Sequence, residues 1–193
     1  MKKRHSETRQ HILDIARALM THKGYTGVGL AEVVATAQVP KGSFYHYFKS
    51  KDEFGQALLE QYFADYLAVV DSLLAGTTPA ADRLLGYFHY WAQTQCSDLP
   101  TDKCLVVKLG AEVCDLSEGM RQVLDKGTQA VHVRLERCIE QGHADGSITS
   151  AIPNSTLAQS LYQIWLGASL MMKIGKRSSA FEDSLTMAKR LLS

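Results

Sequence analysis

A cysteine with lysines on both sides is the first group in this sequence that could carry out covalent chemistry. Cys104 directly follows Lys103 and lies four residues before Lys108. If a helix begins here, two ammonium groups and unpaired backbone N–H groups can surround the sulfur and favour the reactive thiolate. The alternative is an inert core thiol, because cysteine is among the residues most often buried. The segment therefore predicts either a reactive or a buried thiol.

A second group of residues is suited to binding a polyanion. Residues 39–51 read VPKGSFYHYFKSK and interleave four aromatic side chains with lysines and a histidine. Phenol, imidazole and ammonium groups can donate hydrogen bonds to phosphate oxygens. The alternative is a surface helix that ends in a lysine-rich loop, which does not explain the aromatic spacing.

Charge is distributed unevenly along the chain. Residues 1–51 hold nine lysines or arginines and three acids, a balance of +6, whereas the remaining 142 residues hold twelve bases and seventeen acids, a balance of −5. A basic head on an acidic body is the electrostatic pattern of a nucleic-acid-binding protein. The alternative is that the basic residues of segment 1–51 only keep the protein soluble.

Composition excludes several other classes. The chain has 193 residues, 46% of them hydrophobic and 21% charged, as expected for globular domains. Its most apolar stretch, residues 157–172, is interrupted by polar residues, and no signal-peptide core follows the basic start, so we expect a cytoplasmic protein without membrane contact. The four cysteines lack the spacing of zinc or redox motifs, so we expect free thiols and no metal or cofactor.

Short helices are expected to position the basic and aromatic residues. Apolar residues recur at helical spacing before Gly24, and Pro40 separates two further helical segments. The predicted helices cover residues 8–23, 30–37 and 41–48, and a fourth begins after Ser50, which can cap it. This is the pattern of a helix-turn-helix, whose second helix enters the major groove of DNA.

Spacing inside the third predicted helix separates a core face from an exposed face. Phe44 and Phe48 are four residues apart, so both can pack onto the preceding helices. Tyr45, His46 and Tyr47 point away from that face with polar tips, and lysines add positive charge around them. The aromatic and basic residues therefore divide between packing and DNA binding.

Residues 24–54, GYTGVGLAEVVATAQVPKGSFYHYFKSKDEF, resemble the DNA-binding signature of the TetR family of bacterial repressors. The resemblance implies an all-α fold, with a helix-turn-helix domain at residues 1–50 and a helical ligand-sensing and dimerisation domain at residues 51–193. It implies a repressor that binds double-stranded operator DNA, not an enzyme. The residues it places at DNA are Lys41, Gly42, Ser43, Tyr45, His46, Tyr47 and Lys51, with Ser43 and His46 as the candidates for base contacts.

Two positions depart from the family pattern. Gly29 stands where many members have threonine or serine, so a helix cap and a phosphate contact can be missing. Gln38 and Pro40 replace the usual turn glycine and small polar cap. The motif therefore does not predict which operator sequence the protein binds.

The regulatory domain is predicted to hold six helices, the first of which is the one that begins at Ser50. They are expected at residues 50–74, 81–96, 104–113, 117–141, 156–174 and 181–192. By the resemblance, the last two helices pair with those of a second copy to form a homodimer. An apolar face suited to this pairing, or to a monomer core, comprises Leu157, Leu161, Ile164, Trp165, Ala168 and Met172.

Residues 101–127 also resemble the subgroup of this family that senses electrophiles and reactive chlorine. The segments KCLVVKLGAEVCDLSE and WLGASLMMK carry that resemblance, which implies Cys104 as the sensing thiol and Lys173 as its partner. Cys96 and Cys114 are weaker candidates for a resolving thiol, and Cys138 is expected in the core.

Two alternatives for the regulatory domain remain. Tyr87, Trp91, Tyr162 and Trp165 can line a pocket for a reversible small-molecule inducer, or belong to the core. A helical thiol peroxidase with Cys104 as nucleophile leaves the basic head unexplained. We therefore expect a dimeric repressor released by oxidation or alkylation of Cys104.

Overall fold

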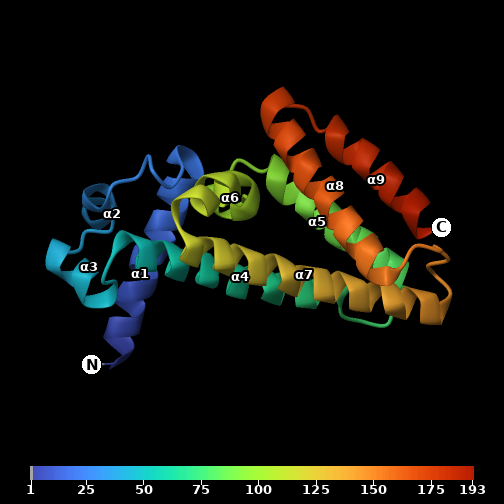
Figure 1. Ribbon diagram of the computed structural model, residues 1–193, viewed down its shortest axis with the longest axis horizontal. Coiled ribbons are helices and arrows are strands. Elements are labelled where there is room, and N and C mark those ends of the chain that lie inside the picture. Colours follow the sequence, from blue (N-terminus) through green and yellow to red (C-terminus); the bar gives the residue numbers. More distant parts are fainter. Residues whose placement is uncertain (1) are drawn as a thin grey trace. The chain divides into compact units, whose positions relative to one another are not determined.

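The chain is helical throughout the described part (Figure 1). The computed structural model describes residues 2–193, with side chains from residue 7 onward, so the side chains of Lys2, Lys3 and Arg4 lie outside the described residues. No strand occurs in residues 2–193, and the all-α prediction is confirmed. The elements are α1 (Lys2–Lys23), α2 (Leu30–Thr36), α3 (Lys41–Tyr47), α4 (Lys51–Leu74), α5 (Ala80–Cys96), the 3-10 helix η1 (Pro100–Asp102), α6 (Leu105–Leu116), α7 (Glu118–Asp145), α8 (Asn154–Gly175) and α9 (Ser179–Leu192).

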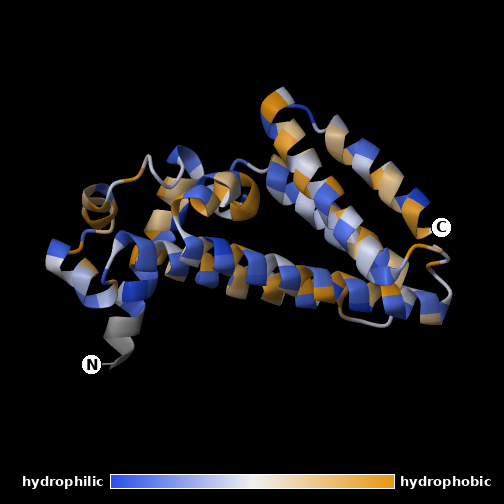
Figure 2. Cartoon of the chain, viewed as in Figure 1, coloured by the Kyte–Doolittle hydropathy of each residue, from blue (hydrophilic) through white to orange (hydrophobic). Residues whose placement is uncertain are grey.

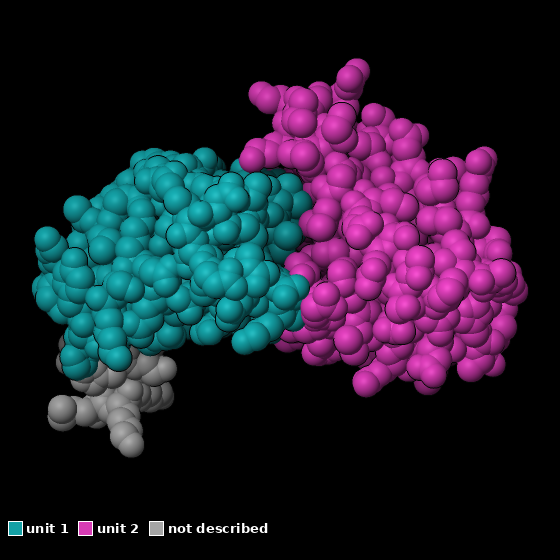
Figure 3. Space-filling model, viewed as in Figure 1, with its two compact units in different colours: residues 1–64, 98–126 teal, residues 65–97, 127–193 magenta. Residues whose placement is uncertain are grey.

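The chain forms two compact units (Figure 3). Unit 1 contains residues 1–64 and 98–126, and unit 2 contains residues 65–97 and 127–193. Unit 1 therefore holds the helix-turn-helix together with η1, α6 and the first part of α7. The predicted functional boundary at residue 50 stays a prediction.

Aromatic packing holds the recognition segment in unit 1. Phe44, Phe48 and Phe54 are buried, and their ring centroids lie within 5.2 Å of one another. Such edge-on aromatic contacts stabilise a core beyond simple burial of area. The predicted inward direction of Phe44 and Phe48 agrees with this packing.

Side-chain caps fix the starts of two long helices. Ser50 Oγ accepts a hydrogen bond from Glu53 N at 3.0 Å, and Glu53 Oε2 accepts one from Lys49 N, the residue before the cap, at 2.8 Å. Ser117 Oγ accepts from Met120 N at 3.1 Å at the start of α7. Both predicted serine caps are confirmed.

Some predicted helix ends are wrong. α7 continues through Gly142, where a Cβ would collide with Ile148, and it ends at Asp145, before Gly146 with φ of +75°. Gly142 is thus a packing position rather than a stop, because Ile148 folds back onto the helix. α6 begins at Leu105, with Cys104 as its N-cap residue, and ends at Leu116 rather than 113.

The apolar face predicted for dimerisation lies mainly in the core of unit 2. Leu157, Leu161, Trp165 and Ala168 are buried within the single chain, where α8 packs beside α5 and α9. Four of the six residues predicted to pair with a second copy are therefore core residues of the single chain, whereas Ile164 and Met172 are half-buried, and pairing through the last two helices stays a prediction. A different set of apolar side chains is exposed on these two helices, namely Leu170, Met171, Ile174 and Met187, and Figure 2 shows the hydrophobic end of α8 beside the loop to α9.

Candidate functional site

Helix α3 presents a mixed polar and aromatic surface. Lys41, Gly42 and His46 are exposed, as is Tyr45 with 51% of its surface accessible, whereas Ser43 and Tyr47 are half-buried. A Cβ built on Gly42 would meet no atom within 4 Å. Another molecule could therefore approach the backbone closely at this helix start.

Lys51 has a structural role that the sequence did not reveal. Its Nζ donates to Tyr25 O at 3.2 Å and lies 4.7 Å from the centroid of the Tyr25 ring, and Tyr25 Oη donates back to Lys51 O at 2.7 Å. Burial, followed by the charges of Asp52 and Glu112, raises the pKa of Tyr25 to about 12. This pair fixes the chain just after α3 to the turn after α1.

The turn between α2 and α3 contains the departure from the family pattern. Gln38 adopts a φ of +54°, a left-handed conformation that favours glycine. His11 Nε2 lies 3.1 Å from Ala37 O, and the Arg9 guanidinium lies 5.2 Å from the centroid of the Phe48 ring. Contacts from α1 therefore support the motif on both sides of Gln38.

Glu112 of α6 binds the turn that follows α1. Its Oε2 accepts from Tyr25 N at 3.0 Å, and its Oε1 accepts from Thr26 N at 2.7 Å and from the Thr26 hydroxyl. Burial alone would raise the Glu112 pKa, but these hydrogen bonds and the Lys51 charge hold that pKa below its ordinary value. Sequence reasoning missed this residue, because its partners lie 86 and 87 positions away.

Cys104 is enclosed in unit 1. Only 6% of its surface is accessible, and the Tyr62 hydroxyl donates to its Sγ at 3.5 Å. Burial raises the pKa of the Cys104 thiol, although hydrogen bonds from Tyr62 and from backbone N–H groups of α6 act in the opposite direction. In this conformation desolvation outweighs the hydrogen bonds, and activation of the thiol by neighbouring charges stays a prediction.

Arg17 connects the surroundings of the thiol to α1. Its guanidinium carbon lies 5.3 Å from the centroid of the Tyr62 ring, and its Nη2 donates to Thr101 O at 2.7 Å. Thr101 lies in η1, three residues before Cys104. Sequence reasoning missed Arg17, because it contacts Tyr62 and Thr101 only in the folded chain.

The other predicted thiol-site residues are distributed over both units. Lys173 is exposed near the end of α8 in unit 2, so its pairing with Cys104 of unit 1 stays a prediction. The predicted free thiols are confirmed, because no disulfide joins the four cysteines, and Cys96 and Cys114 are exposed whereas Cys138 is buried. An electrophile can therefore reach Cys96 and Cys114 without any change of conformation.

The four aromatic residues proposed as a ligand pocket pack together in unit 2. Tyr87, Trp91, Tyr162 and Trp165 are all buried, and Trp91 makes edge contacts with both Tyr87 and Tyr162. Trp91 Nε1 also donates to Ser169 Oγ at 3.0 Å. Their use for binding a ligand stays a prediction.

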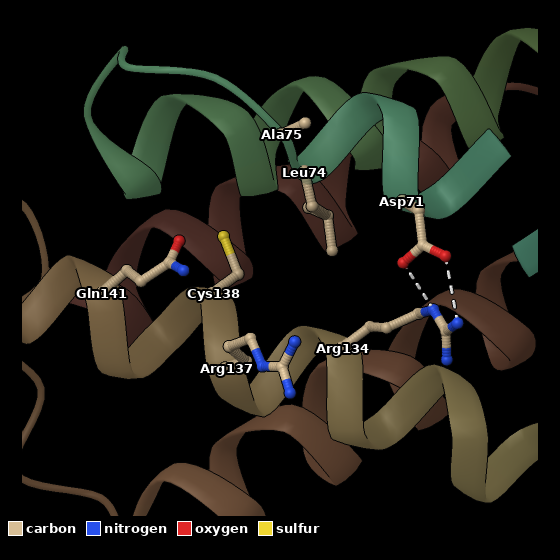
Figure 4. A pocket seen from close by; sticks show the side chains of 7 residues that line it. All are labelled: Asp71, Leu74, Ala75, Arg134, Arg137, Cys138 and Gln141. Atoms are coloured by element: carbon tan, nitrogen blue, oxygen red, sulfur yellow. Dashed lines mark hydrogen bonds and ion pairs between the residues drawn. The ribbon is translucent and has the colours of Figure 1, made fainter. Parts of the chain in front are cut away.

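A small pocket lies elsewhere in unit 2, between α4 and α7 (Figure 4). It has a volume of about 160 Å³ and is lined by Asp71, Leu74, Ala75, Arg134, Arg137, Cys138 and Gln141. Asp71 accepts two hydrogen bonds from Arg134, at 2.7 and 3.0 Å. Burial raises the pKa of Cys138, which disfavours the reactive thiolate form.

Metal sites and membrane spans are absent from the described residues. No group of histidine, cysteine or acidic side chains there could hold a metal ion. None of the helices in that part of the chain is long and apolar enough to cross a membrane.

Family models match most of the chain. Residues 12–58 match the model described as "Bacterial regulatory proteins, tetR family", which covers the helix-turn-helix and the start of α4. Residues 80–188 match the model described as "Tetracyclin repressor-like, C-terminal domain".

Individual proteins are similar over almost their whole length. The chain is 41% identical to the HTH-type transcriptional repressor NemR of Escherichia coli (strain K12) over 96% of this chain and 94% of that protein. It is 32% identical to the HTH-type transcriptional repressor DhaR of Mycobacterium sp. (strain GP1), over 93% and 89%. The crystal structure of reduced E. coli NemR superimposes with a TM-score of 0.92 and 40% identity, covering 97% of both chains.

Proposed function

Because this chain belongs to the TetR family of bacterial transcriptional regulators and is a TetR-like repressor, we propose that modification of Cys104 releases it from operator DNA. The observation that carries the proposal is the enclosed position of Cys104. Its sulfur lies 3.5 Å from the Tyr62 hydroxyl and within the same compact unit as α3. A covalent adduct on this sulfur must displace its surroundings, because close-packed interiors hold few voids of that size.

The DNA-contacting residues are proposed on the surface of α3. Ser43 and His46 are assigned to base edges, and the exposure of His46 supports this. Backbone phosphates are assigned to Lys41, Tyr45, Tyr47 and Lys51, and to the open backbone at Gly42. Lys51 would combine a phosphate contact with its hydrogen bond to Tyr25.

TetR repressors bind DNA as dimers, and we assign the interface of this chain to α8 and α9. Leu170, Met171 and Ile174 of α8 and Met187 of α9 are exposed, and Gly167 leaves open space for a close approach. A second copy that covers these side chains would remove them from water. Two recognition helices in one dimer can then read the two half-sites of a palindromic operator.

Reactivity at Cys104 requires opening of its site. The thiol is buried and its pKa is raised, so a resting thiolate is disfavoured, and a small electrophile or oxidant must enter when Tyr62 moves aside. Lys173 is assigned as the basic partner of Cys104 in the modified state.

Alkylation in a simplified protein tests the proposal. In a Cys96→Ser, Cys114→Ser background, N-ethylmaleimide is allowed to react until mass spectrometry finds one adduct, mapped to Cys104. Binding is measured on a duplex that the reduced protein has selected from random-sequence DNA. Alkylation should weaken this binding, and Cys104→Ser in the same background should bind but no longer respond. Release that persists in the Cys104→Ser protein would show that Cys104 is not the sensing thiol.

A further inference from the structure

Hydrogen bonds connect helix α6 and the η1 segment before it to the helix-turn-helix at two separate places within unit 1. The N-terminal end of α6 carries Cys104, and its last turns carry Glu112. The first tie runs through Arg17 of α1, and the second runs through the turn after α1. The first contact is made with η1, directly before Cys104, and with Tyr62 of α4, whereas the second is made with Glu112 of α6 itself.

The tie at the thiol end depends on one guanidinium group. Arg17 Nη2 holds the Thr101 carbonyl at 2.7 Å, and the same guanidinium lies over the Tyr62 ring. Tyr62 is in turn the donor to Cys104 Sγ. Arg17 thus contacts both the segment that leads to the thiol and the side chain that touches the thiol.

The tie at the other end depends on one carboxylate. Glu112 accepts three hydrogen bonds from Tyr25 and Thr26, two of them from backbone N–H groups. Hydrogen bonds from backbone donors to a carboxylate are stronger than those between neutral groups. Tyr25 continues the connection to Lys51, four residues after Tyr47, the last residue of α3.

We infer that α6 transmits the state of Cys104 to the recognition helix through Arg17 and Glu112, which act as positioning residues. The inference rests on the proposed role of Cys104. Alkylation joins the cysteine sulfur to one carbon of the maleimide double bond, and the thiol proton ends on the neighbouring carbon. The adduct then displaces Tyr62 and the start of α6, so that Arg17 and Glu112 shift their partners on α1 and in its turn.

Conservative variants test this coupling. Glu112→Gln leaves one acceptor but puts amide hydrogens against the donors of the turn, and Arg17→Lys keeps the charge without the planar guanidinium. Glu118→Gln and Arg121→Lys are matched controls, because these two residues form an exposed ion pair with each other in the same unit. All variants carry the Cys96→Ser and Cys114→Ser changes.

Operator binding before and after alkylation is the first measurement. Alkylation of the background protein should weaken binding by about 5- to 150-fold, the usual range of allosteric coupling. Glu112→Gln and Arg17→Lys should react at Cys104 yet show less than about threefold weakening, whereas both controls should respond like the background. A full response in both test variants would overturn the inference, and an unresponsive background would instead reject the sensing role of Cys104.

Hydrogen exchange gives a second measurement that needs no DNA. The Tyr25 and Thr26 amides donate to Glu112, so alkylation of the background protein should speed their exchange by about tenfold. The Met120 amide donates to Ser117 in the same unit and should not change. Unchanged exchange at Tyr25 and Thr26 would overturn the inference, even if a test variant had lost operator binding altogether.

Discussion

Gln38 stores backbone strain next to the recognition helix. Its φ of +54° is unfavourable for a residue with a Cβ, and glycine accepts this conformation freely. Gln38→Gly should therefore raise the free energy of unfolding by about 1 kcal/mol, despite the greater entropy of the unfolded chain. Denaturant unfolding measures the change.

The matched control for Gln38 is an exposed residue of the preceding helix. Ala35 lies in α2 with helical backbone, so Ala35→Gly should lower the free energy of unfolding by about 1 kcal/mol. If both glycine variants lose stability, the left-handed conformation of Gln38 carries no strain.

The buried Cys104 thiol makes stability depend on pH. Because its pKa is raised in the folded chain, the neutral thiol stabilises the fold fully below the ordinary thiol pKa. This contribution is lost as pH rises through the raised folded-state pKa. Serine does not ionise in this range, so the unfolding free energy of the protein should fall relative to that of Cys104→Ser above about pH 8.5. A pH-independent difference between the two proteins would mean that Cys104 is not desolvated.

At the level of single residues, the spacing of residues along a helix predicted which way a side chain points better than it predicted what surrounds that side chain. The interval of four residues placed Phe44 and Phe48 on the inner face of α3, with Tyr45 outside, because a helix fixes those directions. The same reasoning failed at Cys104, because Lys103 and Lys108 were visible in the sequence and Tyr62, 42 positions away, was not. The enclosure of the thiol comes from tertiary packing, which spacing does not encode.

At the level of elements, Gly55 lets α4 pack closely against its neighbours in unit 1. A Cβ at this position would collide with Met120 Sδ of α7 and would lie 2.9 Å from the Tyr25 ring. Gly55→Ala should therefore lower the free energy of unfolding by about 1–3 kcal/mol, although alanine favours a helix. Since Tyr25 also binds Glu112 and Lys51, operator affinity should fall as well.

A second glycine separates helix propensity from packing in this test. Gly86 lies within α5, and a Cβ there would meet no atom within 4 Å. Gly86→Ala should raise stability by up to about 1 kcal/mol and leave operator binding unchanged. Equal stabilisation by both alanine variants would show that α4 can shift to accommodate the new methyl group.

The residue at which a helix begins was easier to predict than the partner against which its apolar face packs. Ser50 and Ser117 mark helix starts through hydrogen bonds that depend only on neighbouring residues. The face of α8 was harder to assign, because Leu157, Leu161 and Trp165 would suit a monomer core and a dimer interface equally well, and they lie in the core of the single chain. Only the packing of α8 with α5 and α9 distinguishes the two.

At the level of the whole molecule, the remaining exposed apolar side chains of α8 predict how two copies associate. Leu170 and Ile174 are four residues apart on one face of α8, and Ile174 has 67% of its surface accessible. Changing both to glutamate would bring negative charges together across a two-fold axis, where each residue meets a copy of the same surface. The double variant should therefore sediment as a monomer at micromolar concentration, where we expect the unmodified protein to sediment as a dimer. Its operator affinity should fall by at least about 100-fold, because a single recognition helix reads only half of the site.

Val133→Glu is the control, since Val133 is an exposed apolar residue of α7, with 54% accessibility, outside α8 and α9. A double variant that remains dimeric, or a Val133→Glu protein that dissociates, would place the interface elsewhere.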